Sequence, residues 1–216
     1  MITYILIGLI SLAVFTLVSY FFAINIIYKK YNKESLNIKN TFMFEVCPQF
    51  KTTNAFIDVL LFISLAATLG GVIVFTSKYL TVMPIVIAVL SLIFLFCVAM
   101  IPFINIKFLK EHLYLNLGSI VCYFAISGLL TYLSYGICKL YDYQNVTAII
   151  AMVISAILLL GAFVFIFNPK IFDLKMDVQD GETVRPKLIH LALSEWILTF
   201  VTPLILIPLI LLSTIM

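Results

Sequence analysis

Long apolar runs, separated by short polar stretches, dominate the pattern of this chain. A helix needs about 20 consecutive apolar residues to cross a hydrocarbon core about 30 Å thick. Runs of that length predict an all-α fold, a polytopic membrane bundle of about six transmembrane helices in a single transmembrane domain, 1–216. The predicted spans are 2–28, 55–76, 83–106, 113–138, 146–168 and 187–215.

Composition supports this class. Hydrophobic residues make up 64% of the chain and charged residues 11%, and the mean hydropathy is +1.21. A soluble domain carries about 25% charged residues, and a transmembrane β-barrel would show alternating segments of about ten residues. Neither a metal signature nor a cofactor motif is apparent in the sequence, and the four cysteines show no CxxC spacing. We therefore expect free thiols, no metal and no cofactor.

Basic residues set the expected orientation. Eleven of the thirteen Lys and Arg residues fall in or beside three connections: loop one (29–54), loop three (107–112) and loop five (169–186). Basic loops are retained on the cytoplasmic side of a membrane. We expect these loops inside and both termini outside. The first span begins within "MITYILIGLI", which has no basic residue before its apolar run, so we expect a retained span rather than a cleaved signal peptide.

Two of the inner loops have β-prone patterns. In loop five, "FDLKMDVQDGETV" alternates apolar and polar residues and contains the turn dipeptide Asp180-Gly181. This pattern predicts a small cytoplasmic β-hairpin within 170–186. In loop one, "TFMFEVCP" is also β-prone and ends at Pro48, so it is a candidate third strand. The acidic residues of loop five do not follow the spacing of a calcium-binding loop.

The last predicted span contains the least expected residues. "RPKLIHLALSEWILTF" places His190, Glu195 and Trp196 in an otherwise apolar run. A charged side chain in mid-membrane costs at least about 2.5–3.5 kcal/mol, so Glu195 must be neutral, paired or hydrated. Thr199 lies on the same helix face, and Pro203 has no N–H to bond the Thr199 carbonyl. We expect a kinked helix whose carboxylate and carbonyl oxygens could receive a proton or a cation.

Other polar residues approach the same side under this topology. They predict an inward-facing polar vestibule, whose candidate members are Asp58, His112, Asn116, His190, Glu195 and Thr199, with Asn25, Asn54 and Asn105 nearby. Most of these have a structural alternative: helix capping for Asn54 and Asp58, an interfacial position for His112 and His190, and interhelix bonding for Asn105 and Asn116. His190 and Glu195 lie five positions apart, about 140° around a helix, so we do not pair them as acid and base.

The leading hypothesis is a non-enzymatic, permease-like or accessory subunit with its vestibule on the cytoplasmic side. The alternative is an intramembrane enzyme that acts on lipid-linked substrates, with Glu195 as acid or base. The chain has twelve Lys and one Arg, and this ratio favours a location in a bacterial cytoplasmic membrane. The expected partners are anionic lipid headgroups near Lys29, Lys30 and Lys33 and other membrane subunits, with no nucleic acid. Gly70-Gly71 is expected to allow a close approach or a bend.

Overall fold

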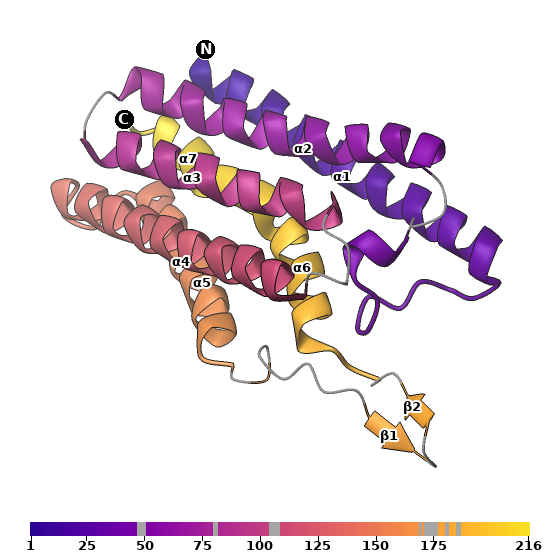
Figure 1. The fold of residues 1–216 in the computed structure, drawn as a ribbon. Helices are drawn as coiled ribbons and strands as arrows, with labels where there is room; N and C mark the ends of the chain where they lie inside the picture. The colour runs from indigo at the N-terminus through magenta and orange to yellow at the C-terminus, as the bar shows by residue number, and fades with distance from the viewer. Residues whose placement is uncertain are drawn as a thin grey trace.

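The computed structural model contains six helical spans that are long and apolar enough to cross a membrane, so the chain is a multi-pass membrane protein (Figure 1). The structure describes residues 1–46, 51–79, 82–103, 109–168, 170, 177–179, 182–184 and 187–216. The first five spans are formed by α1 (Ile2–Asn32), α2 (Lys51–Lys78), α3 (Val82–Met100) with a 3-10 turn, η2 (Ile101–Phe103), α4 (Leu109–Leu140) and α5 (Val146–Ile166).

The sixth span is interrupted, as Pro203 predicts. Helix α6 (His190–Val201) ends before Pro203, a 3-10 turn, η5 (Thr202–Ile205), follows, and α7 (Leu206–Ser213) completes the span. Proline has no N–H to continue the α-helical pattern, whereas a short 3-10 turn accommodates it. Pro208 falls in the first turn of α7, where a missing N–H costs nothing.

The last span is the most buried of the six, because α6, η5 and α7 pack against the other helices. Consecutive helices α1 to α5 pack in sequence order, while α7 contacts α1, α2, α4 and α5, and α6 contacts α3 and α4. A Cβ added to Gly71 of α2 would lie 2.6 Å from Leu206 Cδ2, so the Leu206 side chain of α7 packs directly against this glycine. The expected close approach at Gly70-Gly71 is therefore confirmed at Gly71.

Both termini lie at the same end of the bundle (Figure 1). The hydroxyls of Thr3 and Ser213 are 3.1 Å apart, and the Tyr141 hydroxyl donates to the Ile215 carbonyl at 3.1 Å. The α1–α2 connection and the strands of loop five lie at the other end, which we call the inner end.

Loop one folds back over this inner end. Lys33 takes a left-handed conformation after α1, and the Leu36 N–H donates to Asn25 Oδ1 at 3.4 Å, so the chain returns beside the last turns of α1. Residues Met43–Val46 then form a 3-10 helix, η1. The prediction of a strand in "TFMFEVCP" is wrong for these four residues. The Glu45 carboxylate accepts the Phe42 N–H at 2.9 Å, a helix-capping contact that favours the turn.

Strands β1 (Asp177–Gln179) and β2 (Glu182–Val184) pair antiparallel, with Val178 opposite Thr183. Residues 171–176 and 180–181, which hold the rest of the predicted hairpin and its turn, lie outside the described residues. The hairpin as a whole therefore stays a prediction.

Candidate functional site at the inner end of the last span

Glu195 is fully buried near the start of the last span. It lies five residues after His190, the first residue of α6, which is about 7.5 Å along the helix axis. Its Oε2 accepts the main-chain N–H of Met43 at 3.4 Å. The carboxylate therefore contacts the chain's own loop one, 152 residues away in sequence.

Trp196 makes the second contact of this kind. Its Nε1–H donates to the Thr41 carbonyl oxygen at 2.8 Å, and its side chain is 1% exposed. The indole ring also packs edge-on against Phe21 of α1, with ring centroids 6.3 Å apart. Sequence reasoning noted Trp196 but did not include it among the site residues, because nothing local indicated which carbonyl it would bond.

Thr199 lies one turn further along the same face. Its hydroxyl is 2.9 Å from the Glu195 carbonyl oxygen and 3.3 Å from Met43 Sδ, both within donating distance. Thr41, Phe42, Met43 and Val46 of loop one are all buried. We call residues 41–46 the inner segment. It covers the Glu195 face of α6, and the N–H of Ile189, just before α6, bonds the Lys39 carbonyl at 2.8 Å.

Asn116 of α4 meets the neighbouring face of α6. Its side-chain amide donates to the Leu191 carbonyl at 3.3 Å and to the Ser194 hydroxyl. The Asn116 Oδ1 is buried and has no hydrogen-bond partner among the described residues. The hydrogen bonding between helices that was expected for Asn116 is therefore confirmed for its amide nitrogen.

The other predicted vestibule residues are placed as follows. His190 is half-buried at the start of α6, on a different face from Glu195. Asp58 is half-buried in the second turn of α2. His112 and Asn54 lie in α4 and α2, but their side chains are outside the described residues, as is the whole of Asn105. Asn25 belongs to the inner end through its bond to Leu36. Of the predicted vestibule residues, Glu195 and Thr199 thus share one face of α6, and Asn116 contacts its neighbouring face.

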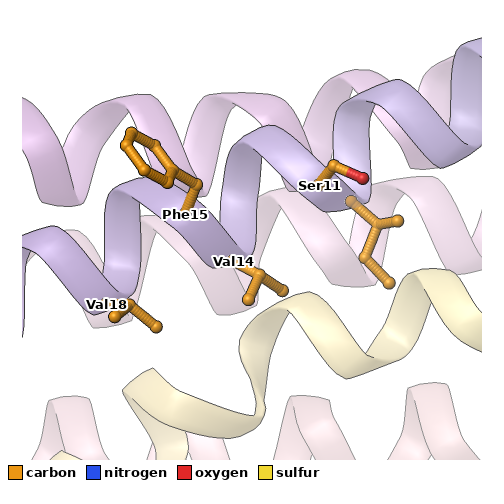
Figure 2. Close-up of a pocket in the computed structure, with 5 residues that line it drawn as sticks. Ser11, Val14, Phe15 and Val18 are labelled. Atoms are coloured by element: carbon orange, nitrogen blue, oxygen red, sulfur yellow. The ribbon is translucent and has the colours of Figure 1, made fainter.

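A separate groove lies on the outward face of α1, with a volume of about 510 Å³ (Figure 2). Its lining residues are Ile10, Ser11, Val14, Phe15 and Val18. Val14 and Val18 point to the side of the C-terminal helix, and Phe15 points the opposite way. Its only polar side chain, Ser11, donates to the Ile7 carbonyl at 2.8 Å. The lining of this groove is therefore almost entirely apolar, and it includes none of the residues around Glu195.

Within the described residues, no group of three or more His, Cys, Asp or Glu side chains is placed to hold a metal ion. No protein family, curated protein or solved structure matches the chain.

Proposed function

We propose that the protein is a non-enzymatic, permease-like subunit of a cytoplasmic membrane, with a polar vestibule on the cytoplasmic side that the inner segment closes. One observation carries the proposal. A fully buried carboxylate, Glu195, sits in a membrane-spanning helix and is covered by a loop of the same chain. Ionisable groups within spans are costly, and they mark ion or solute pathways and proton relays.

The shape of the last span favours transport. Discontinuous helices place backbone carbonyls and side-chain oxygens beside substrates or coupling ions in many transporters. Here the last span changes from α-helical to 3-10 geometry seven residues after Glu195, and Thr199 lies between the two on the Glu195 face. The alternative, acid–base catalysis, would need a second titratable group in hydrogen-bond reach of the reacting atoms. His190 leaves α6 on another face, which favours the non-enzymatic proposal.

The inner end is assigned to the cytoplasm because of its charge. Ten of the thirteen basic residues fall in loops one, three and five, and Lys187 lies directly beside loop five. Lys29, Lys30 and Lys33 are exposed at the end of α1. Each such residue near an anionic membrane surface contributes about 1 kcal/mol of attraction, so anionic headgroups are the proposed lipid partners. The β1–β2 segment would then lie on the cytoplasmic side.

Proton entry into vesicles tests the proposal. The purified protein is reconstituted into liposomes that contain a pH-sensitive dye, and the outside is acidified. Wild type should acidify the lumen faster than protein-free vesicles, and Glu195→Gln, which cannot ionise, should return the rate to the protein-free value. Glu111→Gln removes an exposed carboxylate at the same end of the bundle and should behave as wild type. A wild-type rate equal to that of protein-free vesicles overturns the permease-like assignment.

A further inference from the structure

Two consecutive side chains of α6 bind the main chain of loop one. Trp196 Nε1 donates to the carbonyl of Thr41, and Glu195 Oε2 accepts the N–H of Met43. One group is a donor and the other an acceptor, and their partners are the C=O of one residue and the N–H of the residue two positions later. Every peptide offers this pair of groups, whatever its sequence.

The side chains around Glu195 and Trp196 are mostly apolar, so they favour the binding of apolar side chains. Phe42 and Met43 are each 3% exposed, and Met43 Sδ lies 3.3 Å from the Thr199 hydroxyl. Phe21 and Phe200 add aromatic surface, with ring centroids 6.3 and 6.4 Å from that of Trp196. Burial of apolar side chains supplies binding free energy of about 25 cal/mol per Å². The Glu195 side chain supplies an oxygen that accepts an N–H donor.

We propose that the Glu195–Trp196 pair is a recognition site for short apolar peptides, and that the inner segment occupies it as a built-in competitor. The inference rests on the proposed function and names the substrate class of the same vestibule. A peptide would place a carbonyl on Trp196 Nε1 and an N–H two residues later on Glu195. It would fill the space that Phe42 and Met43 now fill. Recognition through main-chain groups resembles the way extended peptides add to sheet edges, where neighbouring pockets give specificity.

Peptide binding to the full chain in lipid nanodiscs tests this inference. The probe is a fluorescent, amino-acetylated and carboxy-amidated peptide of residues 39–46, KNTFMFEV. The control probe carries an N-methyl group at the position of Met43, which removes the N–H that Glu195 accepts. Binding is followed by fluorescence anisotropy for wild type and for Phe42→Ser/Met43→Ser, a double variant that weakens the competitor and leaves α6 unchanged.

The double variant should bind the probe about tenfold more tightly than wild type, because its own inner segment competes less well. N-methylation of the probe should weaken binding about fivefold to tenfold, the effect of one lost hydrogen bond. Adding Trp196→Phe to the double variant, which keeps an aromatic ring but removes the donor, should weaken binding by a similar factor.

Equal binding of the two probes overturns the proposal. This comparison can be made on wild type, so it does not depend on any variant folding. The absence of saturable probe binding to both wild type and the double variant also overturns it. A negative probe-binding result leaves the proton-entry rates unchanged, and a negative proton-entry result leaves the measured probe binding unchanged, so the failure of this inference and the failure of the proposed function are distinguishable.

Discussion

At the residue scale, the central feature is the partner of Glu195. The sequence singles out this residue, because a carboxylate in an apolar span needs a compensating interaction. The sequence does not indicate that a main-chain N–H from loop one supplies part of it, since the contact joins residues 152 apart. The Trp196 bond to Thr41 is of the same kind. Both contacts indicate that the unusual polarity of α6 serves to hold the inner segment.

Truncation of Glu195 should therefore destabilise the protein. Glu195→Ala removes an acceptor from the buried Met43 N–H, at a cost of about 1–3 kcal/mol. Glu195→Gln keeps an oxygen acceptor and should cost less. For a chain of this length, each kcal/mol lowers the unfolding midpoint by about 2–4 °C. Thermal unfolding in detergent, followed by tryptophan fluorescence, measures the difference. Equal midpoints for Glu195→Ala and wild type would show that the carboxylate does not hold loop one.

At the scale of elements, the break in the last span and its contact with α2 determine how the bundle closes. Pro203 made the interruption predictable. The sequence predicted that a small residue at Gly71 would permit a close approach, but it did not predict that Leu206 would be the contacting residue. In loop one, the local sequence pattern predicted the wrong secondary structure. Its β-prone residues form η1 instead, because Glu45 caps the turn and α6 buries its apolar side chains.

A pair of glycine substitutions tests the α2–α7 contact. Gly71→Ala places a Cβ 2.6 Å from Leu206 Cδ2 in a fully buried site, and overpacking of this kind costs about 1–3 kcal/mol. Gly136→Ala on α4 is the matched control. Apart from its chain neighbours and its own helix backbone, no atom of the described residues lies within 4 Å of a Cβ placed there, and alanine is the better helix former, so stability should be unchanged or raised. If both variants unfold at the same temperature, the two helices are not in the close contact described here.

At the scale of the whole molecule, hydropathy predicted six spans because the requirement for about 20 apolar residues is set by the membrane. The structure agrees on number and differs at the ends: α1 continues to Asn32, and α2 begins at Lys51 rather than at residue 55. The packing order, and the burial of the last span among the others, could not be predicted. Apolar runs show which segments enter the membrane, but they do not show which helices pack together.

The proposed orientation can be tested with single cysteines in a background that lacks the four native ones. A cysteine at position 216 should react with a membrane-impermeant maleimide on intact cells, because both termini are expected outside. A cysteine at Glu34, exposed in loop one, should react only after the membrane is permeabilised. Labelling at Glu34 on intact cells, without labelling at 216, would place the basic loops outside and invalidate the cytoplasmic assignment of the vestibule.

Fluorescence quenching of Trp196 tests most directly the claim that loop one closes the vestibule by docking on α6. Trp196 is the only tryptophan in the chain, so the signal reports this site alone. Acrylamide quenching is compared between wild type and Phe42→Ser/Met43→Ser in nanodiscs. The account predicts weak quenching in wild type and a several-fold steeper dependence on acrylamide in the double variant. Equal slopes in the two folded proteins would contradict it, because Trp196 would then be shielded by something other than the inner segment.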